Sequence, residues 1–409
     1  MHLCGLLPVI AFADDFLQIT VLNKVGDTDL RSRSQSYEIF LQLADIDYRA
    51  RQWSHGEILM QIFSTQEFDK SEHLLHGFDF KRRLAHFCKL PERVRTLGGM
   101  VRAADFKPVM GVPLDELLAE QADTIFQPPH FIFMTDFCGS NLLVQALLEL
   151  GGITCWNEVN AFADLSIHKR LIDRERNAAC SASTTLSDWQ KVLRLALQLM
   201  SESSRITDTV IVKEWPPANY IISDIMLAST EIRAVFLYGD IEDYLNSVFR
   251  HWWRRDFTRR RVLRVLIETD RWPSIDAGKH WLTDAEIAAA HWFVQQQAFL
   301  NVDPRVVARV RSVNNGSLYE RPERTILAVA RHLGLTADLA GAKRAFAQVA
   351  NHHSKSGKPY SMAIRRLEVA RVARTHAFDI REGLAQLRSW TREFPLPPHL
   401  PHALDLDNG

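Results

Sequence analysis

Short apolar runs alternate with amphipathic helical segments over much of the chain after residue 128. Apolar runs begin at Phe131, Val210 and Val235, and each is short enough to be a buried strand. Helical periodicity fills the segments between them, and an alternation of strands and helices builds a parallel sheet with helices on both faces. The pattern therefore predicts an α/β fold, a three-layer domain with a central parallel sheet.

Capping signals indicate where two of the predicted helices begin. Ser187 with Gln190, and Thr283 with Glu286, have the spacing of a capping box, in which side chain and backbone satisfy each other's hydrogen bonds. The first box precedes an apolar helical face that includes Trp189. Helices are therefore expected to start at both places.

Composition shifts divide the chain into three regions. Residues 1–127 show helical periodicity, as at 37–44, and predict a mainly helical N-terminal region. Prolines at 128 and 129 break any preceding helix, so the α/β domain is expected to cover 128–390. The proline-rich, polar stretch 391–409 predicts a disordered tail. The N-terminal region names no chemistry; it could shape a substrate site, form a homo-oligomer interface or be a separate domain.

Charge and apolar content favour a soluble enzyme. The chain has 409 residues, 46% hydrophobic content, a formal net charge of zero and a pI near 7.3. No global field therefore attracts it to nucleic acid or anionic membrane, and no run reaches the roughly 18 apolar residues of a transmembrane helix. The apolar stretch 3–13 lacks the positive charge that precedes a signal sequence, so a buried strand or helix is favoured there over a signal peptide.

Cysteine and histidine spacing bears on compartment and metal binding. The five cysteines form no C-x-x-C pair and are odd in number, which fits a reducing, cytoplasmic compartment. The sixteen histidines show no H-x-x-x-H spacing with acidic partners, so no metal site is predicted.

The stretch 131–158 has the layout of a phosphate-binding loop. An apolar strand enters a turn of small residues, Gly139, Ser140 and Asn141, and an amphipathic helix follows. The small residues let the backbone approach an anion, and the helix N-terminus favours negative charge. The chain contains neither a Walker A motif nor G-x-G-x-x-G, which disfavours ordinary nucleotide hydrolysis and dinucleotide binding. The plain alternative is a buried strand packed on a helix with no ligand.

This stretch resembles the first nucleotide-binding motif of sulfotransferases, in a degenerate, bacterial-type form. Gly139 falls on the second glycine of that motif, Ser140 and Asn141 on its two threonines, and Cys138 on its serine. The resemblance implies binding of 3′-phosphoadenosine-5′-phosphosulfate (PAPS) as co-substrate. Phe137 stands where the family has the arginine or lysine that holds the phosphosulfate, so one cation is missing.

Three later stretches resemble further sulfotransferase elements and occur in the family's order. In 235–250, Ser247 matches a serine that binds the 3′-phosphate, whereas Gly239 replaces an arginine. The stretch 318–335 resembles a family helix; Pro322 suits its first turn and Gly334 its end. The stretch 351–360 resembles a mobile basic loop over the 3′-phosphate, which implies that Lys355, Gly357 and Lys358 bind the nucleotide. A solvated lysine loop is an equally ordinary interpretation.

Two side chains are the main catalytic candidates for sulfuryl transfer, which needs a base and cations. Glu158 lies where the protein-tyrosine branch of the family has a catalytic glutamate, which implies a base; otherwise it is a solvated carboxylate or a salt-bridge partner. Lys213 ends the strand VIVK and should point to the crevice where parallel sheets bind ligands. It could replace the cation missing at Phe137, or simply reach solvent. Glu214 and the pair at 352–353 are secondary candidates for the base.

The segment 250–264 contains seven arginines interleaved with Trp252, Trp253 and Phe257. Such a pattern could stack on bases or bind phosphates. Because it is the only such cluster in a neutral chain and follows the helix of Ser247, we favour a helix surface near the nucleotide or acceptor site over nucleic-acid binding.

Three function classes are consistent with these patterns. The preferred one is a sulfotransferase-like enzyme that binds PAPS or a related 3′,5′-bisphosphorylated nucleotide and sulfates a hydroxyl or amine acceptor. The second is a catalytically degenerate relative that serves as a binding or scaffold protein, which the loss of both cations favours. The third is a phosphotransferase that uses the same loop with an ordinary nucleotide. The sequence does not identify the acceptor.

Overall fold

The computed structural model describes ten segments of the chain, all within one compact unit, Ile58–Gly409: residues 61–65, 68–70, 72–90, 99–102, 110–121, 125–177, 185–203, 209–259, 283–351 and 361–407. The predictions for 3–13, 37–44, 352–353 and 355–358 lie outside these residues.

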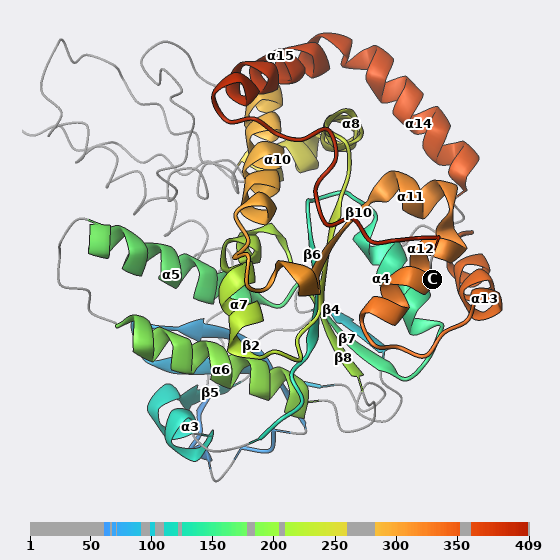
Figure 1. The fold of residues 1–409 in the computed structure, drawn as a ribbon. Helices are drawn as coiled ribbons and strands as arrows, with labels where there is room; N and C mark the ends of the chain where they lie inside the picture. The colour runs from blue at the N-terminus through green and yellow to red at the C-terminus, as the bar shows by residue number, and fades with distance from the viewer. Residues whose placement is uncertain are drawn as a thin grey trace, which may run out of the picture. The chain divides into compact units, whose positions relative to one another are not determined.

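A six-stranded parallel sheet forms the centre of the described unit (Figure 1). Every pairing between neighbours is parallel. In spatial order the strands are β10 (Val310–Asn314), β9 (Ala234–Tyr238), β6 (His130–Met134), β8 (Thr209–Lys213), β7 (Ile153–Asn157) and β4 (Gly99–Arg102). The α/β class with a central parallel sheet is confirmed.

Helices cover both faces of this sheet, which makes the domain three-layered (Figure 1). Successive strand residues point to opposite faces: Phe131 and Phe133 pack into one core, Ile132 and Met134 into the other. On the first face lie α5 (Asn160–Asn177), α6 (Leu186–Glu202) and α7 (Ile222–Ala228). On the second lie α4 (Ser140–Leu148), α12 (Pro322–His332) and α13 (Leu339–Val349).

A further group of helices lies beyond the carboxyl ends of the strands. It consists of α8 (Ile241–Phe249), α10 (Asp284–Leu300), α14 (Met362–Thr375) and α15 (Ala377–Glu393). Their apolar side chains form two small cores of their own, one around Tyr244 and Leu245 and one around Phe293 and Trp390. Because ligands of open parallel sheets bind outside the carboxyl ends of the strands, these helices enclose the edge where a site is expected.

The described part of the N-terminal region contains strands as well as a helix. Its second sheet has the order β1 (Gln61–Ile62), β5 (Met110–Pro113), β3 (Leu84–Lys89), β2 (His73–Asp79), and α3 (Leu114–Gln121) follows β5. The sequence pattern predicts a mainly helical region; strands of two to seven residues are too short to show a period of their own. Strand β4 also precedes residue 127, yet it pairs with β7 of the central sheet.

The helix ends agree in part with the predicted caps. At α10, Thr283 and Glu286 form the predicted capping box, and Gly334 has the left-handed φ of +80° that ends the helix beginning at Pro322. The prediction for α6 is wrong by two residues. Its N-cap is Thr185, whose hydroxyl accepts from the N–H of Asp188 at 3.1 Å.

The sequence predicts a disordered tail at 391–409, but residues 394–407 pack against the edge of the central sheet (Figure 1). The Ser312 N–H in β10 donates to the carbonyl of His402 at 3.1 Å, and the Leu404 N–H donates back to the Ser312 carbonyl at 2.9 Å. Leu400 is buried. An edge strand presents unpaired backbone groups, and these contacts order a segment whose composition alone predicts disorder.

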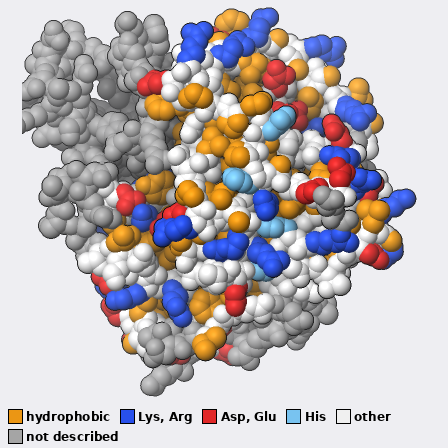
Figure 2. Space-filling view, viewed as in Figure 1, with side chains coloured by type: hydrophobic (Ala, Val, Ile, Leu, Met, Phe, Trp, Pro, Cys, Tyr) orange, Lys and Arg blue, Asp and Glu red, His pale blue; other side chains and the backbone are white. Residues whose placement is uncertain are grey.

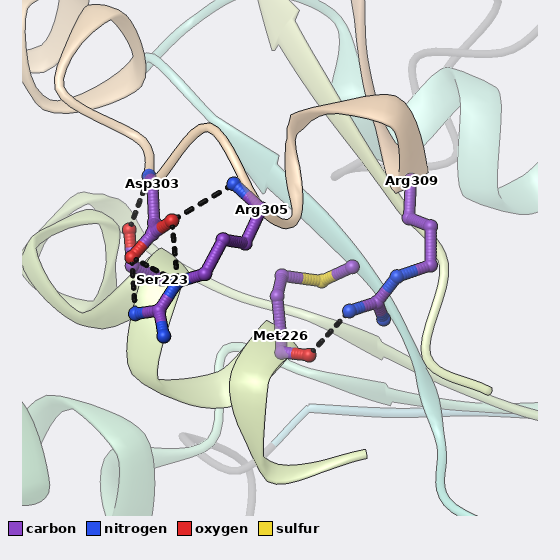
Figure 3. A network of polar contacts seen from close by, with 5 residues as sticks. All are labelled: Ser223, Met226, Asp303, Arg305 and Arg309. Atoms are coloured by element: carbon purple, nitrogen blue, oxygen red, sulfur yellow. Dashed lines mark hydrogen bonds and ion pairs between the residues drawn. The ribbon is translucent and has the colours of Figure 1, made fainter. Parts of the chain in front are cut away.

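Arg309 joins the last strand of the sheet to the helix on its first face (Figure 3). From a 3-10 turn, Val307–Arg309, its guanidinium donates to the carbonyls of Met226, Ser229 and Ile232 at 2.8 to 2.9 Å. The last carbonyls of a helix have no partners within it, so Arg309 satisfies the C-terminal end of α7. The nearby Arg305 pairs with Asp303. This network is structural.

Charge and hydropathy of the described part agree with the composition. The face in Figure 2 carries lysine and arginine side chains interspersed with acidic and apolar ones. Among the helices of the ten described segments, none is both long and apolar enough to span a bilayer. The same segments contain no cluster of three or more metal-ligating side chains.

Candidate functional site

The loop between β6 and α4 turns sharply because two of its residues adopt left-handed backbone. Phe137 has φ +61° and Gly139 has φ +88°. A Cβ at Gly139 would lie 2.7 Å from the Tyr319 hydroxyl, so glycine is required there for space as well as for conformation. Gly139 is also the N-cap of α4, and it has no side chain to cap that helix end. This is the geometry by which backbone N–H groups at a helix N-terminus bind anions.

The side chains of the three other predicted loop residues are buried. The Ser140 hydroxyl donates to the Met134 sulfur at 2.7 Å, and the Asn141 side-chain oxygen has no hydrogen-bond partner among the described residues. Burial raises the pKa of the Cys138 thiol to about 12, so the thiol stays neutral. An anion at this loop would therefore meet chiefly backbone, and a cation to balance its charge would have to come from elsewhere in the chain.

Arg254 brings a cation to the loop. Its guanidinium lies 4.9 Å from the centre of the Phe137 ring, and its Nη1 donates to the Ser247 carbonyl at 2.8 Å. Arg254 is buried, with 8% of its surface exposed, and Ser247 with 7%. The two predicted phosphate-binding elements thus meet at one arginine. The sequence singled out its cluster but not this residue.

The three other described arginines of that cluster pair with acids or aromatic rings. Arg250 pairs with Glu368 at 3.1 Å, and Arg259 with Asp284 at 2.8 Å. Arg255 lies 5.7 Å over the Phe249 ring. Trp252 and Trp253 are exposed. Residues 252–259 are helical, and the side chains of Arg250, Arg255 and Arg259 form no open basic groove.

The place of the second missing cation is filled by an amide. A Cβ at Gly239 would lie 2.8 Å from the Asn315 Nδ2, and Trp292 Nε1 donates to the Gly239 carbonyl at 2.8 Å. A side chain of any size at Gly239 would displace Asn315.

Glu158 and Lys213, the two catalytic candidates, form an ion pair at the carboxyl ends of neighbouring strands. Lys213 Nζ donates to Glu158 Oε1 at 2.7 Å and to Asn157 Oδ1 at 2.8 Å. Lys213 is fully buried, so the alternative in which it reaches solvent is wrong; Glu158 keeps 34% of its side chain exposed. Lys213 pairs with Ile132 of β6, the strand whose carboxyl end leads into the loop, so the ion pair lies at the same edge of the sheet as the loop.

The backbone at Glu158 is strained. Its φ is +58°, in the left-handed region that residues other than glycine rarely adopt. Its N–H donates to the Lys213 carbonyl at 2.7 Å, which fixes this conformation. Strain of about 1 to 3 kcal/mol persists where the surrounding structure holds it, typically at functional sites. In this conformation the Glu158 carboxylate accepts a hydrogen bond from Lys213.

Glu214 is a buried acid beside this pair. It has no exposed surface, and burial raises the pKa of its carboxyl well above the usual value, with Glu158 adding to the rise and Lys213 opposing it. The raised pKa favours the neutral form of Glu214, and in that form it leaves Glu158 as the carboxylate that pairs with Lys213. This agrees with Glu214 being only a secondary candidate for the base.

The raised pKa of Glu214 predicts a pH-dependent stability. Above about pH 4.5 the unfolded chain loses this proton while the folded protein keeps it, so this group's contribution falls as pH rises, by about 1.4 kcal/mol per pH unit over that window. Glu214→Gln removes the ionisation. We expect the melting temperature of the variant to gain on that of wild type as the pH rises from 5, measured by thermal unfolding over a range of pH. A constant difference across this range would contradict a proton held on Glu214.

Several side chains near the loop were not found from the sequence. Asp136, in the loop itself, has Oδ2 3.9 Å from Nδ1 of the buried His291, which also contacts the Tyr244 hydroxyl at 2.9 Å. Arg365 stacks 4.1 Å over the Tyr319 ring, the ring that adjoins Gly139. No local motif marks these residues, because they come from distant parts of the chain.

Comparisons with known proteins give structural matches only. No protein-family model matches the chain, and no curated protein matches it. Similar solved structures include a sulfotransferase from Alicyclobacillus acidocaldarius, 12% identical, with a TM-score of 0.30 over 65% of this chain and 96% of that one. A mouse sulfotransferase complexed with PAP is 10% identical, with a TM-score of 0.33 over 68% and 94%. A sulfotransferase from Mycobacterium tuberculosis is 14% identical, with a TM-score of 0.31 over 63% and 80%.

Proposed function

We propose that this protein binds PAPS, or a related 3′,5′-bisphosphorylated nucleotide, and transfers its sulfuryl group to a hydroxyl or amine acceptor. The observation that carries the proposal is the Glu158–Lys213 pair, 2.7 Å apart at the carboxyl edge of the sheet, where the Gly139 loop leaves β6. The two residues lie at the ends of different strands, and the sequence predicts a separate role for each, the base for Glu158 and the cation for Lys213. A base, a cation and an anion-binding turn at one edge of a parallel sheet are what the reaction needs.

The chemistry assigns one role to each side chain. Glu158 accepts the proton of the acceptor as its oxygen or nitrogen attacks sulfur. The bond between sulfur and the bridging phosphate oxygen breaks, so the sulfuryl group passes to the acceptor and adenosine 3′,5′-bisphosphate leaves. Lys213 stabilises the negative charge that develops on the transferring group. Glu158, partly exposed, can reach both an acceptor and Lys213.

The nucleotide contacts extend the proposal. Backbone at Cys138, Gly139, Ser140 and Asn141 would hold the 5′-phosphosulfate and Ser247 the 3′-phosphate; Lys355, Gly357 and Lys358 remain predicted from the sequence resemblance alone. A cytoplasmic location, homo-oligomer formation and the regional division at 127 and 390 also stay predictions.

A binding or scaffold protein of the same fold is the second candidate. Asp136 places a carboxylate in the loop that should receive an anion, and Asn315 fills the space of the second cation. Both features would weaken binding of a polyphosphorylated nucleotide.

The first experiment is calorimetric titration with adenosine 3′,5′-bisphosphate, with ATP as the control ligand. Micromolar binding of the bisphosphate is expected, with weaker binding to Ser247→Ala. Ser140→Ala should change the affinity less, because the buried hydroxyl of Ser140 donates to Met134 and the loop backbone would hold the anion. Absence of bisphosphate binding to the wild-type protein would refute the proposed function and leave the scaffold candidate.

A further inference from the structure

Arg254 is the strongest unassigned feature of the site. It is an almost buried cation, it comes from the helical residues 252–259, and it contacts both predicted phosphate-binding elements. Its guanidinium lies where these two elements come together. Its contacts include the rings of Phe137 and Trp253 and the carbonyl of Ser247.

We propose that Arg254 is the cation that binds the nucleotide in this protein. Its guanidinium would lie between the 5′-phosphate and the 3′-phosphate and contact both, which would make the protein prefer a bisphosphorylated nucleotide. The inference rests on the proposed function and adds to it the residue that replaces the cation absent at Phe137. The Phe137 ring then has a role of its own, because the guanidinium of Arg254 stacks on it.

The geometry supports this role in three respects. A cation within about 6 Å of a ring centre is attracted to the ring face, and Arg254 lies 4.9 Å from the Phe137 centre. Its hydrogen bond to Ser247 fixes the other side of the guanidinium at 2.8 Å from that carbonyl. A guanidinium has five N–H donors in a planar fork that matches phosphate oxygens. Arg254 therefore lies between the loop of Gly139 and the helix of Ser247.

Its neighbours along the chain do not share this position. Arg255 stacks on Phe249 instead, 5.7 Å from the ring centre, and Arg250 pairs with Glu368. Arg255 therefore offers a matched control, because it has the same chemistry and lies one residue away on the same helical segment.

The test is calorimetric titration of wild type, Arg254→Gln, Arg254→Lys and Arg255→Gln with adenosine 3′,5′-bisphosphate and with 5′-AMP. Arg254→Gln should weaken bisphosphate binding about 10- to 100-fold, as expected for loss of a charge-assisted contact, and should narrow the preference for the bisphosphate over 5′-AMP. Arg254→Lys keeps the charge but loses the planar stacking, so its affinity for the bisphosphate should lie between those of wild type and Arg254→Gln. Arg255→Gln should bind like wild type.

A rescue variant separates lost charge from lost structure. Phe137→Arg combined with Arg254→Gln returns a cation to the loop position and should recover a large part of the affinity lost in Arg254→Gln. If wild type binds the bisphosphate and Arg254→Gln binds it equally well, the role of Arg254 is wrong while the proposed function stands. If Arg254→Gln weakens both nucleotides without narrowing the preference, and the double variant rescues nothing, Arg254 is structural only. Failure of wild type to bind refutes the proposed function itself.

Discussion

Replacing Glu158 by glutamine is expected to lower sulfuryl transfer about 10²- to 10⁴-fold, the usual contribution of a positioned general base. Glutamine keeps an oxygen that can accept from Lys213 Nζ, now 2.7 Å from Glu158 Oε1, but it cannot take a proton from the acceptor. The rate of adenosine 3′,5′-bisphosphate formation from PAPS, with acceptors found by screening hydroxyl and amine compounds, measures this effect.

Nucleotide binding should survive the same substitution. Glu158 is assigned to the acceptor proton and not to a phosphate, so titration with adenosine 3′,5′-bisphosphate should give an affinity like that of wild type or better. Glu149→Gln is a matched control, since Glu149 is an exposed acid at the other end of α4, and it should leave the rate unchanged. Unchanged turnover in Glu158→Gln would remove Glu158 as the base.

Replacing Gly139 by alanine is expected to have the largest effect on stability. A φ of +88° is unfavourable for any residue with a Cβ, and strain of this kind costs about 1 to 3 kcal/mol. The new Cβ would also lie 2.7 Å from the Tyr319 hydroxyl, and Arg365 stacks 4.1 Å over that ring. Urea unfolding should show a lower free energy of unfolding, and titration should show weaker binding of adenosine 3′,5′-bisphosphate.

Gly151→Ala separates the two causes of this loss. Gly151 has φ +83°, close to that of Gly139, but nothing lies within 4 Å of the place where its Cβ would be. It should therefore show the backbone cost alone, and Gly139→Ala should lose more. Adding Tyr319→Phe to Gly139→Ala should recover the steric part only. Equal losses at both glycines would mean that Tyr319 moves aside freely.

Local signals in the sequence identified the framework of the site. The turn at Gly139, the capping box of Thr283 and the helix from Pro322 to Gly334 are all found where expected. Each depends on the conformational preferences of a few adjacent residues, which act regardless of the rest of the fold. The same local logic was wrong by two residues at α6, where Thr185 and Ser187 are both acceptable caps and the structure uses the first.

Composition was a weaker guide than local motifs. The proline-rich segment after α15 lacks a pattern of its own, but it packs on β10 because that edge strand offers backbone partners. Strands β2 and β3 of the N-terminal region pair with each other across a short turn. The sequence pattern did not predict them, because such short strands show no clear periodicity. Whether the C-terminal segment is ordered, and whether the N-terminal region forms strands, thus depends on contacts with other parts of the fold that the local sequence does not specify.

The sequence by itself determined the parallel α/β sheet, the glycine turn before α4 and the strand ends that carry Glu158 and Lys213. Only the tertiary structure decided how the charges are arranged. It paired Lys213 with Glu158, 55 residues away in the chain, and stacked Arg254 on Phe137. Hydrophobic periodicity fixes which residues of a strand or helix are buried. Contacts between side chains that are distant in the sequence depend on how whole helices and strands pack together, and no local pattern encodes that packing.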